Sequence, residues 1–559
     1  MSVLRNPLHP FPRFPHPAGQ AFTPLDVKAE AVSVETVEDL FAEKPKLRTL
    51  VAGFGVLLGD AERGRLAIKK ALNNVFEGRL RTLALRADSP ENHGIGHVSL
   101  PAGSHPVDLW IAAKLEIAVA ASNPTDRYWH LAELFSLAIA VVVRAALIGF
   151  QFGRFSVTPR RCRLLVLNAW PEARWLTIFG AFRDHADFKD GDLVAEVNLT
   201  GSRDFEIIPT VNPAELPVLL SSWFREAVWG SALMAFRAVV VGTIGSKDAR
   251  VVEAAIQTLR VTNHLLDARR LTRAVSYDVC VDNVEYGTRH ILVAALGHGY
   301  MARWPHSAAM DNSGVMMSYL GYDLYLDGGE HQYQSHRHTW LHSARCVAVG
   351  MLQNDQHFIG TANVREDLRQ AIEARVNRGQ RMVILFGPSD LAPLWPPFRE
   401  LALTAIKYIS RRDDCFLVVK PKFNNVLYTH VPELDACENV VSICYDPSGE
   451  EICPTGYLIK KSDLTLVLAG SPIFESLTQG RACFAAYPAI QETPLRKMLV
   501  SCGVLYENPQ DLGKAMKRYL DDPHSFQIPF DWFRENLDPF ADDRALERTV
   551  NALVQHAND

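Results

Sequence analysis

Short apolar runs alternate with amphipathic segments through the C-terminal part of the chain. Most of the runs are rich in β-branched and aromatic residues, and segments with helical periodicity lie between most of them. The runs occupy 382–386, 416–420, 440–444, 464–470, 482–487 and 503–506. Continuous apolar strands separated by helices are typical of a parallel sheet that is covered on both faces. The pattern therefore predicts a doubly wound α/β domain over residues 346–525.

The N-terminal part alternates less regularly. Apolar runs at 48–55 and 81–87 predict two strands with a helix between them, and a long helical zone follows at 107–155. Further strands are expected at 161–170 and 277–283, on either side of a helix-rich region. Together these segments predict a second α/β domain over 45–345 with helical insertions. The expected fold class is thus α/β, with two domains and a helix-rich, partly irregular N-terminal region.

Both ends of the chain differ from these domains. Residues 1–44 begin with a proline-rich stretch and predict an irregular arm, whereas 526–559 predict a helix able to pack on either domain. The glycines at 53, 55 and 59 do not have the Gly-x-Gly-x-x-Gly spacing. They are interpreted as turns between strand and helix rather than as a dinucleotide fingerprint.

One apolar stretch, 131–152, is long enough to cross a bilayer. It contains Glu133 and Arg144, and an arginine near the middle of a membrane helix costs at least about 2.5 kcal/mol. The pattern therefore favours a core helix of a large domain. A helix that lies on a membrane surface stays open as an alternative.

Composition excludes several classes of protein. The 559 residues are 48% hydrophobic and 22% charged with a net charge of −5, which does not suit a dedicated nucleic-acid-binding protein. Nine cysteines without CxxC spacing indicate reduced thiols, and residues 1–20 have no continuous apolar core of the kind found in a signal peptide. A cytoplasmic protein, in one alternative peripheral to the inner membrane, is expected.

The most informative motif is LTLVLAGSPIFESLTQG, at 464–480. A strand ends at Gly470-Ser471 and a helix starts at Pro472, so Ser471 is expected to cap the helix and leave backbone N–H groups for a phosphate. Glu475 lies one turn, about 5 Å, further along and is placed to hold a ribose. The alternative stays open that Ser471 is only a cap and that Glu475 only favours the first turn.

Residues 454–488 resemble the donor-site segment of GT-B type glycosyltransferases that build bacterial capsules and surface polysaccharides. That group has a helix ending in Lys-x-x-Asp or Ala-Asp, then a strand, a Ser/Thr-rich turn, a glutamate and a glycine. The matching positions are Tyr457, Asp463, Ser471, Glu475 and Gly480. Two positions depart from the pattern, because Pro472 replaces a second hydroxyl residue and Ala482 replaces a proline.

Two further segments resemble the same group. FLVVKPKF, at 416–423, is similar to a strand that ends Lys-Pro-His-Pro, so the resemblance makes Lys420 and Lys422 candidate phosphate contacts, although lysine lacks the neutral chemistry of imidazole. The segment 282–314 resembles the N-domain turn that faces the transferring sugar. His306 is the first candidate for a general base, with Glu285 and Asp311 as others. A purely structural role for His306 stays open.

The resemblance implies two Rossmann-like domains facing a cleft and a metal-independent glycosyltransferase without a cofactor. Its nucleotide-activated sugar would be bound by Lys420, Lys422, Gly470, Ser471, Glu475 and Tyr457, with Arg481 as a further cation, and its acceptor would be a glycan or lipid-linked. A polyol-phosphate transferase, a nucleotide-sugar epimerase and a non-catalytic scaffold of polysaccharide assembly remain alternatives. A second motif holds His331, His336, His338 and His342. It lacks HExxH, so a polar surface stretch is favoured over a zinc site.

Overall fold

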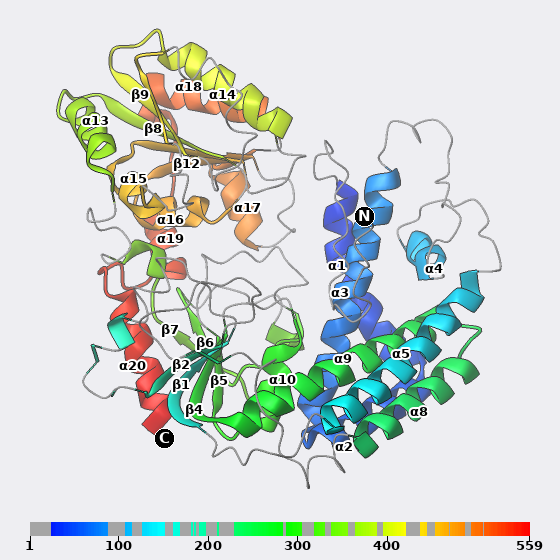
Figure 1. Ribbon diagram of the computed structural model, residues 1–559. Coiled ribbons are helices and arrows are strands. Elements are labelled where there is room, and N and C mark those ends of the chain that lie inside the picture. Colours follow the sequence, from blue (N-terminus) through cyan, green and yellow to red (C-terminus); the bar gives the residue numbers. More distant parts are fainter. Residues whose placement is uncertain are drawn as a thin grey trace.

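The computed structural model contains two parallel β-sheets and a group of long helices (Figure 1). It describes residues 24–558 except 88–106, 115–125, 151–159, 168–179, 183, 186–188, 190, 197–209, 212–227, 283–286, 304–317, 330–336, 356–363, 388–394, 421–436, 444–452, 469, 487–493 and 507.

The first sheet has seven described strands in the order β3-β2-β1-β4-β5-β6-β7, all parallel to their neighbours. Their bounds are β1 Arg160–Val166, β2 Leu193–Glu196, β3 Thr210–Val211, β4 Val275–Asp282, β5 Tyr300–Arg303, β6 Leu324–Asp327 and β7 Arg345–Ala348. The strands expected at 161–170 and 277–283 are confirmed as β1 and β4. Val279 and Val281 of β4 pack in one core with α20 (Ala545–Asn558), whereas Tyr277 and Cys280 belong to a second core with the N-terminal helices.

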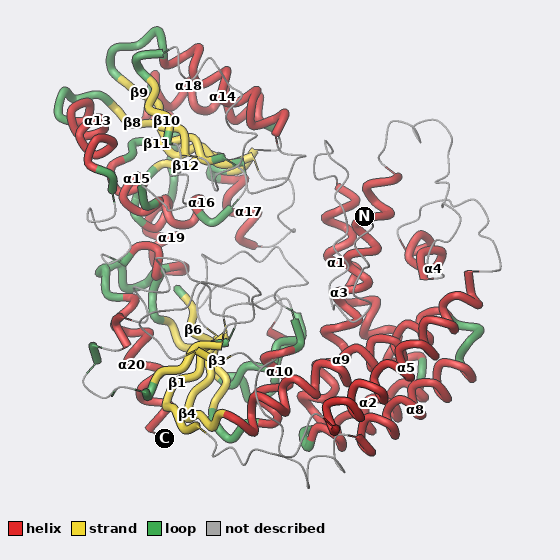
Figure 2. Tube along the Cα trace, viewed as in Figure 1, coloured by secondary structure: helices red, strands yellow, loops and turns green. Residues whose placement is uncertain are grey.

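The N-terminal helices form a bundle beside this sheet (Figure 2). They are α1 (Pro24–Glu43), α2 (Pro45–Leu58), α3 (Ala61–Ala87), α4 (Val107–Lys114), α5 (Asp126–Phe150), α8 (Gly230–Ile244), α9 (Ala249–Ala274) and α10 (Arg289–Leu296). The helical zone predicted within 107–155 is confirmed where it is described. So is a helix-rich region before β4.

Three local predictions for this bundle are wrong. The segments 48–55 and 81–87 are helical rather than strands, and the expected irregular arm contains α1. In α2 the buried residues Leu47, Leu50, Val51, Phe54 and Leu58 follow helical spacing. Gly55 allows α3 to approach closely, since a Cβ on Gly64 would lie 2.6 Å from the Gly55 Cα. Gly53 and Gly55 therefore lie within a helix and serve its packing, whereas Gly59, with φ 83°, turns the chain from α2 to α3.

The second sheet agrees with the alternation in the sequence. Six described parallel strands have the order β10-β9-β8-β11-β12-β13. They are β8 Arg381–Phe386, β9 Cys415–Lys420, β10 Val440–Ser442, β11 Leu464–Val467, β12 Ala482–Ala486 and β13 Leu505–Tyr506. Along β8, Met382 and Ile384 face one core and Val383 and Leu385 face another. Both faces of the sheet are thus buried, which confirms the predicted doubly wound domain.

Helices cover each face of the second sheet. The core that contains Met382 includes α13 (Glu366–Val376), α15 (Thr455–Lys461), α16 (Pro472–Thr478), α17 (Pro494–Ser501) and α19 (Phe530–Leu537). The opposite core includes α14 (Trp395–Ile409) and α18 (Pro509–Asp521). The fold class is therefore two parallel-sheet α/β domains with a helix-rich N-terminal region.

The end of the chain connects the two domains. α19 packs against α16 of the second domain, and α20 packs on the first sheet. Between them Asp538 accepts a hydrogen bond from Asn354 Nδ2 at 3.1 Å, and Asn354 also donates to Thr478 Oγ1 at 2.9 Å. The predicted terminal helix is thus two helices, one on each domain.

Candidate functional site

The strand order of the second sheet identifies where a ligand is expected. The chain runs outward through β8, β9 and β10, then returns to the other side of β8 through β11, β12 and β13. The reversal lies between β8 and β11, and open α/β sheets bind ligands beyond the carboxyl ends of the strands at such a point. The register pairs Phe386 with Val467 on one side and with Lys420 on the other. The segments after β11 and β9 therefore begin at the same edge.

The turn after β11 brings Ser471 and Glu475 together. Gly470 has φ 125°, a conformation that favours glycine, and α16 starts two residues later. Ser471 occupies the N-cap position, but its hydroxyl makes no capping hydrogen bond and donates instead to Glu475 Oε1 at 2.7 Å. The expectation of a side-chain cap is wrong, because the carboxylate one turn along binds the hydroxyl.

The start of α16 offers fewer free amides than expected. Pro472 has no N–H, and the amides of Phe474 and Glu475 both donate to the Ser471 carbonyl, at 2.9 and 3.2 Å. α16 is also only seven residues long. A phosphate here would therefore depend on side-chain cations more than on the helix terminus.

The two charged candidates at this edge are buried. Glu475 exposes 4% of its surface and Lys420 exposes 3%. Lys420 is the last residue of β9, and its carbonyl accepts a hydrogen bond from Gly387 N at 2.9 Å. Buried charges require polar partners or a ligand. Both Glu475 and Lys420 have polar interactions within the protein. Lys422 lies outside the described residues.

Three other positions of the resembling segment contact protein groups. Tyr457 is buried in the core, and its hydroxyl donates to Glu373 Oε1 at 3.4 Å. Burial raises the pKa of this tyrosine above its ordinary value. Asp463 Oδ2 accepts the Met382 amide at 2.8 Å at the start of β8, and Arg481 donates to the Lys460 carbonyl at 2.6 Å. These residues fix the strands around the switch point, and Ser471, Glu475 and Lys420 lie at its carboxyl edge.

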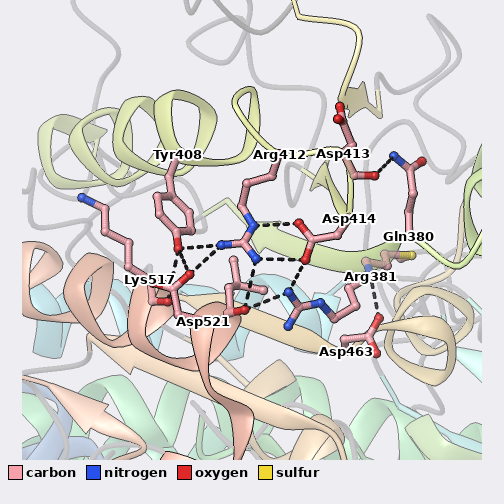
Figure 3. A network of polar contacts seen from close by, with 11 residues as sticks. Gln380, Arg381, Tyr408, Arg412, Asp413, Asp414, Asp463, Lys517 and Asp521 are labelled. Carbon is pink, nitrogen blue, oxygen red and sulfur yellow. Dashed lines mark hydrogen bonds and ion pairs between the residues drawn. The ribbon is translucent and has the colours of Figure 1, made fainter.

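A charged network occupies the opposite, amino edge of this sheet (Figure 3). Arg412 donates to Asp414 at 2.8 Å and to Asp521 at 2.6 Å, and Arg381 donates to Asp414 at 2.5 Å. The hydrogen bonds from Arg412 hold the pKa of Asp414 well below its usual range. This network connects β8, β9 and α18 on the side away from the switch point, so it is structural.

The first sheet has a second cluster, which the sequence analysis missed. Asp282, Arg303 and Asp327 are the last residues of β4, β5 and β6, and each exposes 2% of its surface or less. Arg303 Nη1 donates to Asp327 Oδ1 at 3.1 Å. Because the register pairs Asp282 with Arg303, all three lie along one carboxyl edge. The signal available in the sequence was that each of these apolar strands ends in a polar residue.

His290, at the start of α10, adjoins this edge. Its Nδ1 lies 3.8 Å from Asp282 Oδ2, and its ring stacks on Tyr322 with centroids 4.3 Å apart. Burial, with the charges of Lys70 and Arg63, lowers the pKa of His290 well below its ordinary value. The imidazole is therefore neutral, and its Nε2 accepts a hydrogen bond from the Gly321 amide at 3.5 Å.

The three catalytic candidates lie outside the described residues. Glu285 follows the end of β4 by three residues, and His306 and Asp311 come after the end of β5. β4 adjoins β1 at the point where the chain order of the first sheet reverses. The segments that contain all three thus leave the sheet at its carboxyl edge.

The histidine motif does not form a helical face in the described part. His338 belongs to a three-residue 3₁₀ turn (Arg337–Thr339), and the His342 amide donates to Glu62 Oε1 at 2.8 Å. His331 and His336 are outside the described residues. Among the residues that the structure describes, no three His, Cys, Asp or Glu side chains are grouped as a metal site would require.

No family model matches the sequence, and neither does any curated protein. Among solved structures, the wall teichoic acid polymerase TagF is 11% identical, with a TM-score of 0.40 over 78% of this chain and 98% of that chain. The UDP-GlcNAc 2-epimerase from Neisseria meningitidis, bound to UDP-GlcNAc, is 12% identical, with a TM-score of 0.42 over 71% of this chain and 100% of that chain. The S. aureus MnaA-UDP co-structure is 14% identical, with a TM-score of 0.43 over 71% and 97%. Similarities at this level carry no information about activity.

Proposed function

We propose that the protein is a glycosyltransferase that moves a sugar from a nucleotide-activated donor to a surface-polysaccharide or other glycan acceptor. The observation that supports this most is the position of Ser471, Glu475 and Lys420. Lys420 ends β9, and Ser471 and Glu475 follow β11. These two strands flank β8, so all three residues belong to the carboxyl edge of the second sheet, where β8 and β11 form the switch point. A buried carboxylate and a buried ammonium at a switch point match the ribose and the phosphate of a nucleotide.

Glu475 has the geometry to exchange one hydroxyl partner for another. Its carboxylate accepts a hydrogen bond from the Ser471 hydroxyl at 2.7 Å. A ribose hydroxyl would replace the serine as donor, and the second carboxylate oxygen would accept from the neighbouring hydroxyl. The Ser471 hydroxyl would then be able to donate a hydrogen bond to the phosphate. This exchange keeps the buried carboxylate hydrogen-bonded throughout.

The leaving phosphate would be stabilised by cations. Lys420 ends β9 beside the switch point, and Lys422 follows two residues later. Positive charge that is already in place where negative charge develops lowers the barrier to departure of the nucleotide. Across from it, His306, Glu285 or Asp311 would take the proton of the acceptor hydroxyl, since these residues follow strands of the first sheet.

Binding of the donor tests this proposal. Isothermal titration of the full chain with UDP-, GDP-, CMP- and CDP-linked sugars is expected to identify one nucleotide class that binds. Glu475→Gln should weaken that binding by about tenfold or more, since a hydrogen bond to a charged group contributes about 1.5–3 kcal/mol. The matched variant Glu373→Gln alters a carboxylate on α13 and should leave binding unchanged.

Two results would contradict the proposal. One is that no donor binds, and the other is that both variants bind the donor equally well. If a donor binds, mass spectrometry of the products separates the alternatives. A hexose added to the acceptor supports the transferase, whereas transfer of a phosphate-bearing unit, an epimerised donor or an unchanged donor indicates a polyol-phosphate transferase, an epimerase or a scaffold.

A further inference from the structure

Two helices far from both switch points expose large apolar side chains. α5 and α8 lie side by side on α9 in the helical bundle (Figure 1). Eleven exposed residues on and next to them, here called the apolar face, each expose between 36% and 74% of their surface. They are Tyr128, Trp129, Phe135, Ile139, Val143 and Leu147 on α5, and Trp229, Leu233, Phe236, Val240 and Ile244 on or next to α8. Clustered exposed apolar groups of this kind mark an interaction surface.

The packing of α8 is inverted relative to a helix on a water-facing surface. Its buried residues are mostly small: Ser231, Ala235, Ala238 and Gly242, together with Met234. A Cβ on Gly242 would lie 2.4 Å from Leu134 Cδ2, so α5 and α8 need this glycine to approach each other. Helices packed in lipid have this arrangement, with small residues at the contact between helices and large apolar residues on the outer surface.

Arg144 and Glu133, two charged residues of α5, pair with residues of α9. Arg144 donates to Asp267 at 2.8 Å and to Asn263 at 2.5 Å, both on α9. Glu133 accepts from Arg260 of the same helix at 2.7 Å. The two charges that argued against a spanning helix are thus paired with α9, although the side chains of Arg144 and Glu133 stay 30% and 38% exposed. The expected core helix is thus packed on one side only.

Aromatic residues mark both ends of the apolar face. Contact between Gly242, near the end of α8, and Leu134, near the start of α5, shows that the two helices are antiparallel. Tyr128 and Trp129 therefore lie at the Ile244 end, and Trp229 lies at the opposite end. Tryptophan and tyrosine favour the level of lipid headgroups. An apolar face with aromatic residues at both ends suits helices that lie in the plane of a membrane surface.

The charge at the margin of this face is suited to anionic lipid. Arg237 on α8, Lys247 just after it and Lys46 on the neighbouring α2 are exposed. Within 128–147 and 229–244 the one acidic residue is Glu133, whose side chain is 38% exposed and pairs with Arg260 of α9 at 2.7 Å. Cations next to an anionic membrane surface each add about 1 kcal/mol of attraction. α5 is also the described helix that is long and apolar enough to cross a bilayer, a property that buried core helices share.

We propose that the apolar face docks on an anionic phospholipid bilayer, with α5 and α8 in the plane of the membrane and their outer side chains in the boundary between headgroups and acyl chains. The inner sides of both helices remain on α9, so neither helix crosses the bilayer. This docking does not depend on the proposed transferase activity, and its test uses no nucleotide sugar.

Vesicle flotation of the full chain tests the proposal. The protein is mixed with vesicles of phosphatidylcholine alone or of phosphatidylcholine with phosphatidylglycerol, at low and at high salt. We expect it to float with the anionic vesicles, and the bound fraction should fall at high salt. The double variant Ile139→Gln, Phe236→Gln should lower the partition coefficient about tenfold or more, because two apolar side chains leave the lipid.

The double variant Val500→Gln, Phe540→Gln is the matched control. It changes two exposed apolar residues of the C-terminal part and should float like the parent protein. A third variant, Arg237→Glu with Lys247→Glu, keeps the apolar face and should lose most of the preference for anionic vesicles. Far-UV circular dichroism confirms that each variant is folded.

Three outcomes would overturn the proposal. In the first, the parent protein does not float with any vesicle. In the second, the parent protein and the Ile139→Gln, Phe236→Gln variant float equally well. In the third, light scattering finds a dimer that the Ile139→Gln, Phe236→Gln variant dissociates while vesicles bind neither form. The apolar face would then be a contact between two copies of the chain.

Discussion

The Arg303–Asp327 pair shows what burial does to a charged residue at the edge of a sheet. Both side chains are almost completely enclosed, and they are 3.1 Å apart at the carboxyl ends of adjacent strands. In water such a pair would contribute little, but inside the protein each charge depends on the other. The pair therefore fixes the relative position of β5 and β6, next to the segment that contains His306.

Replacing Asp327 with asparagine should destabilise the first domain. The variant leaves Arg303 buried opposite a neutral group, at a cost of about 3–5 kcal/mol. Urea unfolding followed by circular dichroism measures the change. Asp414→Asn is the control, since Asp414 is half-exposed in the amino-edge network and its loss should cost about 1 kcal/mol or less. Equal effects of the two substitutions would contradict the account of the buried pair.

At the scale of elements, α9 is a long helix whose start is fixed by one side chain. Asp248 is its N-cap, with Oδ1 accepting the Arg250 amide at 3.0 Å, and Lys44 lies 2.7 Å from Oδ2. Burial alone would raise the pKa of Asp248. Hydrogen bonds from Arg250 and Lys44 outweigh that effect and lower the pKa to about 2.

This lowered pKa predicts the direction of a pH effect. The pKa of Asp248 in the folded protein is below its unfolded value of about 3.9, so its contribution to stability is complete above about pH 4. That contribution disappears as the pH falls toward about 2. Asp248→Asn should therefore flatten the acid limb of the curve of stability against pH. The prediction would be wrong if thermal melting between these pH values gave the same slope for both proteins.

The elements of the second domain could be predicted because its strands are buried on both faces. Such strands, β8 and β9 among them, appear in the sequence as continuous apolar runs. The segment 48–55 has the same appearance but buries a helical stripe, and only tertiary packing distinguishes the two cases. Chain pattern and resemblance together made Ser471 and Glu475 candidates, and the structure brings the two side chains into contact. Asp282, Arg303 and Asp327 were missed, because they are 21 or more residues apart and only the sheet register brings them together.

At the scale of the whole molecule, the helix that contains Glu475 is connected to the junction of the two domains. Asn354 follows β7 and binds Thr478 at the end of α16, and it also binds Asp538 in the segment that leads back to the first domain. Gln479 donates to Asn354 Oδ1 at 2.8 Å. Burial raises the pKa of Asp538, which is surrounded by this junction. If the domains close on a donor, the movement would therefore act on the helix that we propose holds the nucleotide.

The most direct test of the central claim is amide hydrogen exchange of the full chain with and without the nucleotide sugar that binds it best. The account predicts slower exchange in peptides that cover 470–479, because the donor would occupy the turn between β11 and α16. Peptides of the amino-edge network around Arg412 should not change. Unchanged exchange at 470–479, with protection elsewhere in the chain, would contradict a donor site at the switch point of the second sheet.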